Sequence, residues 1–451
     1  MPISFKCSAC GRALKAPDAA AGRTVKCLAC GEPIVVPAAE IDPLAILLGT
    51  DAGSNADSRE DHEEPPESPP PTSRPVPVRE KPKPALATLP PLTSNEPPFW
   101  RRHLHWLLVL AMLPLAYSLL VAKSGDDLES RLNETLSEAP LEVQIRFLQA
   151  AESGASSDEL IELLPEKRLK GAWLSRSTWA HWGLAAVATA LFLVFFMFLA
   201  SDGSAQPTHV ALVGLFTATI GVGTLLLVQG IASLTEGRLV VGNIVFMVIF
   251  SIFKFISFSY NAALDPENGF LLSFVGFTLG VGLCEELVKS VPLFRHSRKN
   301  RAGTWRGLFI WGLASGAGFG IAESLMYSSR HYNGIMGPGI YLVRFASCVA
   351  LHAIWSGSVA ITLYLRRDWF DKAERWRDLL APTLLVIGVP MILHGLYDTS
   401  LKREMNGLAL VVAIASFGWL AFLSSRLYGR DDVSANDEML REYRRRKKAM
   451  S

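Results

Sequence analysis

The stretch GVGLCEELVKSVPLF, from Gly280 to Phe294, places three charged side chains in a segment that is otherwise apolar enough to cross a bilayer. A charge at the centre of a bilayer costs about 2.5 to 3.5 kcal/mol on insertion scales, so these side chains must face a polar interior. We therefore predict that Glu285, Glu286 and Lys289 belong to a functional site inside a helical membrane protein.

Three further apolar segments carry polar groups at helical spacing. They read FGIAE from Phe319 to Glu323, HAIWS from His352 to Ser356, and HGLYD from His394 to Asp398. Residues four apart lie on one face of a helix, so each polar pair projects in one direction and the stripes are predicted to meet in one pocket. The pairs are Glu285 with Lys289, His352 with Ser356, and His394 with Asp398.

The composition points to a membrane protein. Half of the 451 residues are hydrophobic, and they come in blocks too long for a soluble core, so we predict an all-α polytopic membrane protein with eight to nine transmembrane helices. The formal charge of +2 averages acidic against basic segments and gives no reason to expect a nucleic-acid partner. The candidate spans are 104–122, 179–200, 208–230, 239–260, 269–294, 305–328, 339–365, 380–400 and 406–427.

Four of the six cysteines form two CxxC pairs near the N-terminus, Cys7 with Cys10 and Cys27 with Cys30. Their spacing is typical of a zinc ribbon, in which four thiolates hold one structural Zn²⁺ and leave no open coordination position. Redox-active CxxC pairs are the alternative, but no βαβ pattern surrounds them. Residues 1–37 are therefore predicted to form a small zinc-ribbon-like domain that binds a cytoplasmic partner or merely folds.

The segments between the ribbon and the main apolar domain differ sharply in composition. Residues 38–98 turn acidic and then proline-rich, which predicts a disordered linker that cannot bury a core. Residues 99–123 hold the first candidate span. Residues 124–178 are a polar insert with short amphipathic stretches, predicted to be a small helical module, and residues 179–428 hold all the motifs quoted above.

Basic residues indicate the orientation in the membrane. The loops 295–306 and 366–377 and the basic tail 429–451 alternate correctly for the positive-inside rule, which places them in the cytoplasm. Arg101 and Arg102 place the N-terminus there too, and a four-thiolate zinc site suits a reducing compartment.

Two cytoplasmic termini require an even number of crossings. The first thirty residues also lack the apolar core of a secretory signal peptide. We therefore predict eight full crossings among the nine segments. The weakest segment is 239–260, because it carries Lys254 in its middle.

The set EExxK, FxxxE, HxxxS and HxxxD, in this order within one polytopic domain, resembles the PrsW family of intramembrane proteases. That family is similar in turn to the CAAX prenyl endopeptidases. The resemblance implies an endopeptidase of the glutamic or metalloprotease type in a bacterial-type cell membrane, acting on membrane-anchored proteins such as anti-sigma factors. It implies a catalytic site made of Glu285, Glu286, Lys289, Glu323, His352, His394 and Asp398.

The two glutamates are expected to differ, because adjacent helical residues lie about 100° apart and Lys289 can pair well with only one of them. The other glutamate would face the cavity as a general base toward water, and the resemblance favours Glu285 for that role. Asp398 is expected to fix the tautomer of His394. Glu323 is expected to position water, bind a metal or pair with Lys289. A catalytic metal stays open, since histidines with carboxylates suit a metal-bound or a glutamate-activated water.

A second class of function fits the same residues. In a non-catalytic sensor, transporter or scaffold, the polar cluster would bind an ion or stabilise the bundle, and the ribbon would recruit a partner. Geometry separates the two hypotheses. Convergence of a glutamate with His352 and His394 favours the protease, whereas dispersal over different faces excludes it.

Overall fold

The computed structural model describes residues 3–6, 12–16, 24–27, 30–35, 103–121, 128–201, 203–235, 242–299, 304–373 and 375–427. The predicted linker at 38–98 and the basic tail at 429–451 lie outside the described residues.

Two antiparallel hairpins lie near the N-terminus. They pair β1 (Ile3–Lys6) with β2 (Ala13–Ala16) and β3 (Thr24–Lys26) with β4 (Pro33–Val35). Cys27 and Cys30 lie in the turn of the second hairpin, which Gly31 closes with a positive φ of 74°. Cys7 and Cys10 lie outside the described residues, so the zinc site of the ribbon stays a prediction.

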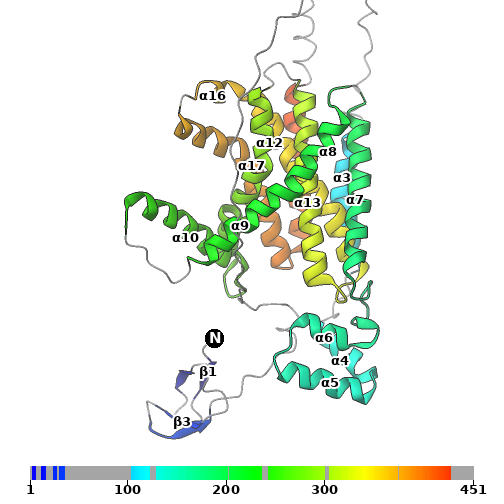
Figure 1. Cartoon of the computed structure of the whole chain (residues 1–451), viewed down its shortest axis with the longest axis vertical. Coiled ribbons are helices and arrows are strands. Elements are labelled where there is room, and N and C mark those ends of the chain that lie inside the picture. Colours follow the sequence, from blue (N-terminus) through cyan, green and yellow to red (C-terminus); the bar gives the residue numbers. More distant parts are fainter. Residues whose placement is uncertain are drawn as a thin grey trace, which may run out of the picture.

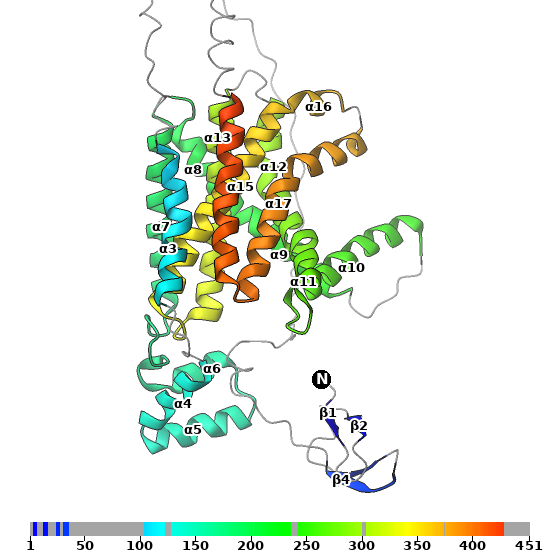
Figure 2. The same cartoon turned by 180° about the vertical axis from the view of Figure 1, so that it is seen from behind.

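Helices make up the rest of the described chain, as Figures 1 and 2 show. The first part holds α3 (His105–Val121), α4 (Leu128–Glu138), α5 (Leu141–Glu152), α6 (Ser157–Leu163), η2 (Pro165–Lys167), α7 (Thr178–Leu199), α8 (Pro207–Phe216), η3 (Thr217–Gly221), α9 (Val222–Ser233) and α10 (Ile244–Leu264). The second part holds α11 (Phe270–Gly276), η4 (Phe277–Gly282), α12 (Leu283–Lys299), α13 (Trp305–Tyr327), η5 (Ser328–Tyr332), α14 (Pro338–Leu342), η6 (Val343–Cys348), α15 (Val349–Leu365), α16 (Arg367–Asp371), η7 (Trp376–Leu379), α17 (Leu380–Lys402) and a last helix, Asn406–Leu427.

The predicted fold class is confirmed. Among the described residues, eight helices from Trp179 onward are long and apolar enough to cross a membrane. The apolar helix α3 is shorter, although it packs on α14, η6 and α15 along the length of the bundle (Figure 2). The segment 239–260, predicted to be the weakest candidate for a crossing, corresponds to the uninterrupted 21-residue helix α10. By length, the weakest candidate for a crossing is α3.

Helix α10 leans away from the other helices in both views (Figures 1 and 2). Its buried residues, Ser257, Ser259, Ala262 and Ala263, all lie in its C-terminal half. That half packs closely on α11, where a Cβ at Gly276 would lie 2.5 Å from the backbone nitrogen of Ala263. Small residues on both sides therefore fix this end of α10 against the bundle.

Helix α15 lies at the centre of the bundle and is buried on all sides. It packs against α13 through a stripe of small residues, Gly312, Gly316 and Gly320. A Cβ at Gly312 would lie 2.6 Å from the carbonyl oxygen of Ser356, so only glycine allows the two backbones to approach this closely. This approach brings polar residues of α13 and α15 within contact distance.

Four π-helical turns interrupt the bundle helices, and three of them adjoin motif residues. The turn η4 ends just before Glu285, η5 follows the helix that carries Glu323, and η6 leads into the helix that carries His352. Such turns shift the helical register and often occur at functional sites. Here they set which face of each helix carries the motif residues.

Helices α4, α5 and α6 form a separate group at one end of the bundle (Figure 1). They fall within the segment predicted as a helical module. Their apolar core includes Leu132, Phe147 and Leu160, and α6 starts with a capping box formed by Ser156 and Glu159.

Candidate active site

The first two turns of α12 supply the charged side chains of the EExxK motif. All three are buried, with Glu285 5% exposed and Glu286 and Lys289 not exposed at all. The Lys289 Nζ lies 2.6 Å from Glu286 Oε1 and 3.8 Å from Glu285 Oε2. Lys289 therefore pairs closely with only one of the two glutamates, which is the asymmetry expected from helix geometry.

His352, on α15, is held from both ring nitrogens. The ammonium group of Lys289 lies 2.9 Å from Nδ1, and Glu323 Oε2, on α13, lies 2.8 Å from Nε2. An ammonium group has no lone pair, so Nδ1 accepts and Nε2 donates to Glu323. Three helices thus fix the tautomer and the orientation of one imidazole.

His394, on α17, lies among three carboxylates. Its Nδ1 is 3.1 Å from Glu286 Oε1, and its Nε2 is 3.3 Å from Asp398 Oδ2 and 3.6 Å from Glu285 Oε2. The ring stacks on Trp355 at 4.3 Å between centroids. The stacking fixes the plane of the imidazole, so Nε2 points between Glu285 and Asp398.

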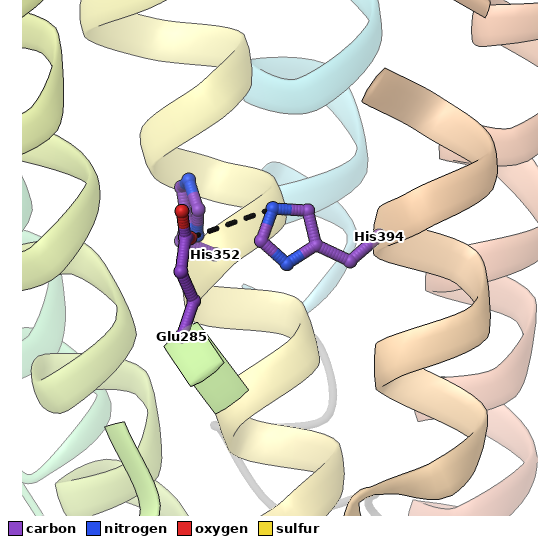
Figure 3. A group of neighbouring side chains, drawn as sticks. All are labelled: Glu285, His352 and His394. Carbon is purple, nitrogen blue, oxygen red and sulfur yellow. Dashed lines mark ion pairs between the residues drawn. The ribbon is translucent and has the colours of Figure 1, made fainter. Parts of the chain in front are cut away.

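The predicted site residues converge. Figure 3 shows Glu285, His352 and His394 pointing toward one another from three different helices. Glu323 contacts His352, whereas the predicted alternative of a pair with Lys289 is not what the structure has. Ser356 is not joined to His352 either, because its Oγ has no hydrogen-bond partner among the described residues.

Sequence reasoning missed Arg344 in the turn η6. Its Nη1 donates to Glu323 Oε1 at 3.2 Å and its Nε donates to the hydroxyl of Tyr332 at 3.1 Å. The signal was weaker than that of Lys289, because Arg344 is a charge near the start of its apolar segment, where an arginine ordinarily reaches the interface. Trp355, which stacks on His394, was missed as well, because a tryptophan in an apolar run indicates packing and nothing more.

A cavity of about 760 Å³ opens beside the cluster. Glu285, Glu323, Asp398 and Arg344 line it, whereas His352 and His394 are buried beneath these side chains. Tyr260 of α10 lines the same cavity, and its hydroxyl has no hydrogen-bond partner among the described residues. Leucine and phenylalanine side chains form much of the remaining wall, so the cavity can take both an apolar segment and water.

The cluster has more acidic than basic groups. Its four carboxyl groups and two cationic groups belong to Glu285, Glu286, Glu323 and Asp398, and to Lys289 and Arg344. The second oxygens of Glu285 and Glu286 are buried and have no hydrogen-bond partner in the described part of the chain. Buried unpaired carboxylate oxygens are costly, so the cluster favours protons or a bound cation.

One set of donors fits a divalent metal ion. One ligand atom from each of Glu285, His352 and His394 lies within 4.8 Å of the other two. A carboxylate with two imidazoles is a donor set of catalytic zinc sites, and Glu285 Oε2, which has no hydrogen-bond partner among the described residues, is available for it. His352 would exchange one of its two hydrogen bonds for the metal.

Comparison with known families identifies this part of the chain. The sequence model described as PrsW family intramembrane metalloprotease matches residues 233–424. Residues 233–424 are a PrsW-family domain. The resemblance drawn from the motifs is thereby confirmed, and the PrsW domain contains every residue of the cluster. Its match begins later than the predicted start at residue 179. No curated protein and no solved structure matches the chain.

The PrsW domain and the eight long apolar helices together support an integral multi-pass membrane protein with an intramembrane protease domain. A protease in the membrane acts in contact with the lipid bilayer and on a membrane-anchored substrate.

Proposed function

We propose that the protein is an intramembrane endopeptidase in which Glu285 activates a water molecule against a peptide bond of a membrane-anchored protein. The observation that carries the proposal is the position of Glu285. Glu285 lines the cavity, its buried Oε2 has no hydrogen-bond partner among the described residues, and His394 Nε2 lies 3.6 Å from that oxygen. A buried carboxylate that no cation holds by a hydrogen bond is the form of general base that this chemistry needs.

In the proposed reaction, Glu285 takes a proton from water as the water oxygen bonds to the carbonyl carbon. The same proton then passes to the amide nitrogen as the carbon–nitrogen bond breaks, which leaves a carboxylic acid and an amine. His394 Nε2 lies between Glu285 and Asp398 and can hold the proton between these two steps. Glu286, held by Lys289 at 2.6 Å, keeps the other side of the His394 ring in place.

In a metal-bound form, which the family description implies, Glu285, His352 and His394 would instead serve as the ligands that hold the ion. When bound, such an ion supplies a Lewis acid that polarises the peptide carbonyl and lowers the pKa of water. Glu323 and Lys289 orient the His352 ring in either case, because they contact both of its nitrogens.

The position of Glu285 beside His352 and His394 also favours the protease over a non-catalytic protein. A non-catalytic sensor, transporter or scaffold needs no carboxylate without a hydrogen-bond partner beside a cavity, and in the described part of the chain Glu285 is such a carboxylate. The convergence of Glu285, His352 and His394 is the arrangement that the protease hypothesis required.

We propose membrane-anchored regulators of the anti-sigma-factor kind as substrates, a bacterial-type cell membrane as the location, and cytoplasmic termini. The N-terminal ribbon is proposed to be a separable zinc-folded module that docks a cytoplasmic partner, because a closed four-thiolate site has no position for substrate or water. Residues 38–98 would tether it to the membrane.

The test compares membranes of cells that express the wild-type protein or the Glu285→Gln variant. Mass spectrometry of newly formed N-termini should find termini within or next to transmembrane segments only with the wild type. A peptide that spans such a site then serves as a reporter in reconstituted vesicles. Identical sets of termini from the two proteins would exclude the proposed activity.

A further inference from the structure

Arg344 joins the catalytic cluster to the end of the bundle that carries helices α4, α5 and α6. Its guanidinium group contacts Glu323 through Nη1 and the Tyr332 hydroxyl through Nε, and it lies over the ring of Tyr327 at 4.0 Å. The side chain is 16% exposed and that of Glu323 is 15% exposed. Glu323 in turn contacts His352 at 2.8 Å.

The backbone around Arg344 is fixed as well. Its carbonyl oxygen accepts a hydrogen bond of 2.8 Å from the hydroxyl of Ser324, which is adjacent to Glu323 on α13. The Tyr341 hydroxyl donates to the carbonyl oxygen of Tyr332 at 2.8 Å. These two bonds join η6 to α13 and α14 to η5, so the elements on both sides of the loop between η5 and α14 are held in place.

That loop, residues 333–337, is built into the core of the helical group α4–α6. Ile335 is 1% exposed and packs with Leu132, Phe147 and Leu160. Arg131 Nη2 donates to the carbonyl oxygen of Ile335 at 2.6 Å. The buried side chain of Ile335 and the hydrogen bond from Arg131 therefore hold the middle of the loop against the helical group.

Backbone contacts fix the two sides of the same loop. The backbone nitrogens of Leu169 and Trp173 donate to the carbonyl oxygens of Gly334 and Met336 at 2.8 and 3.0 Å. Gly334 has a φ of 80°, and a Cβ there would lie 2.8 Å from Ile161. The loop thus fits the helical group only in this conformation.

We propose that Arg344 is a positioning residue for the Glu323–His352 pair, and that the helical group of residues 128–177 keeps Arg344 in place by holding the loop 333–337. The proposal rests on the proposed function for its catalytic meaning. The helical group then controls the site through the loop: loss of its contacts with the loop releases Arg344, and Glu323 no longer orients His352.

The geometry predicts how the variants differ. A lysine at position 344 keeps the charge near Glu323 but cannot also reach Tyr332, because the two contacts use different arms of the guanidinium group. Arg344→Lys should therefore retain part of the activity that Arg344→Gln loses. Loss of an outer contact of this kind typically costs about 10-fold to 100-fold in activity.

The experiment uses the full-length protein in vesicles and the reporter peptide defined above. Arg131→Gln changes a residue that does not line the cavity, and it should lower kcat about 10-fold with an unchanged KM. Hydrogen–deuterium exchange of residues 338–352 should become faster in the same variant. The matched control is Arg146→Gln, on α5, where the arginine is exposed and pairs only with Glu142 among the described residues.

Unchanged exchange in Arg131→Gln, or a kcat equal to that of Arg146→Gln, would overturn the proposal. So would an Arg344→Gln variant with the kcat of the wild type. The exchange measurement needs no substrate, so it decides the link between the helical group and Arg344 even where the wild type cleaves nothing. A wild-type protein that cleaves nothing would contradict the proposed function but not the link between the helical group and Arg344.

Discussion

Lys289 and His352 are joined by a buried contact of 2.9 Å between Nζ and Nδ1, although 63 residues separate them in the chain. The same ammonium group lies 2.6 Å from Glu286. One lysine therefore compensates a buried carboxylate and selects the tautomer of a buried imidazole. This double role explains why a charge of high insertion cost lies in the middle of an apolar helix.

Removal of this cation should destabilise the fold. Lys289→Met leaves the Glu286 carboxylate buried without its cation, which typically costs about 3 to 5 kcal/mol in unfolding free energy. Adding Glu286→Gln removes the unpaired charge and should restore much of the loss. Denaturant unfolding in detergent measures both variants.

The matched control for this pair is Arg146→Met, which breaks an exposed ion pair with Glu142. An exposed pair contributes at most about 1 kcal/mol. Equal losses in Lys289→Met and Arg146→Met would show that the buried pair does not hold the fold together.

The four catalytic variants test the assignment of the site. Glu285→Gln, Glu286→Gln, His352→Ala and His394→Ala should each lower cleavage of the reporter peptide by at least about 10²-fold, the usual contribution of acid–base catalysis. Each variant should still insert in the membrane. Initial rates in reconstituted vesicles provide the measurement.

Ser356→Ala is the control for these variants, because Ser356 lies on the same helix as His352 and its hydroxyl has no hydrogen-bond partner among the described residues. It should cleave at the wild-type rate. Wild-type rates in all four catalytic variants would end the enzyme hypothesis.

Much of this site could be predicted from the sequence. A charge in hydrocarbon is so costly that a charged residue in an apolar segment indicates a functional site even when its partner is not known. That rule singled out Glu285 and Lys289. The spacing of four residues also predicted the His394–Asp398 contact, since both lie on one helix.

Contacts between helices could not be predicted in the same way. The pair of His352 with Glu323 depends on how closely α13 approaches α15, which the glycine stripe and the π-helical turns decide together. Arg344 lies near the start of its apolar segment, where an arginine ordinarily reaches the interface. Only the fold shows that it points inward to Glu323.

The glycine stripe gives a prediction about packing. Gly312→Ala adds a methyl group 2.6 Å from the carbonyl oxygen of Ser356, so α13 and α15 must separate. Overpacking of this kind costs about 1 to 3 kcal/mol. Thermal unfolding should show the loss, and cleavage should fall with it because Glu323 moves away from His352.

Gly223→Ala is the matched control, because a Cβ at Gly223 meets no atom within 4 Å. Alanine favours helix over glycine by about 1 kcal/mol, so this variant should be neutral or slightly stabilised. A Gly312→Ala variant as stable as Gly223→Ala would contradict the packing argument.

Metal content separates the two predicted metal sites. Replacement of Cys7, Cys10, Cys27 and Cys30 by serine in the full-length protein should remove one equivalent of zinc. One equivalent of metal should remain and disappear on addition of His394→Ala. Elemental analysis of the purified proteins measures both. A protein without these four cysteines that holds no metal and still cleaves the reporter would assign water activation to Glu285 without a metal ion.

The last prediction concerns the orientation of the chain in the membrane. Helix α3 has 17 residues, which reach about 25 Å at 1.5 Å per residue and lie at the lower limit for a crossing. It nevertheless packs along the bundle, whereas α10 leans away from it (Figures 1 and 2). We therefore expect α3 to cross and α10 not to cross fully, which gives eight crossings and puts both termini in the cytoplasm.

Reporter fusions at three positions test this topology. Fusions at Glu60 and Ser434 should report the cytoplasm, because the basic loops fix that side. A fusion at Gly154, in the turn after α5, should report the opposite side, since one crossing by α3 separates it from Glu60. If α3 does not cross and α10 does, Gly154 reports the cytoplasm together with the other two. If all nine apolar helices cross, Glu60 and Ser434 lie on opposite sides, and the argument from the zinc ribbon is wrong.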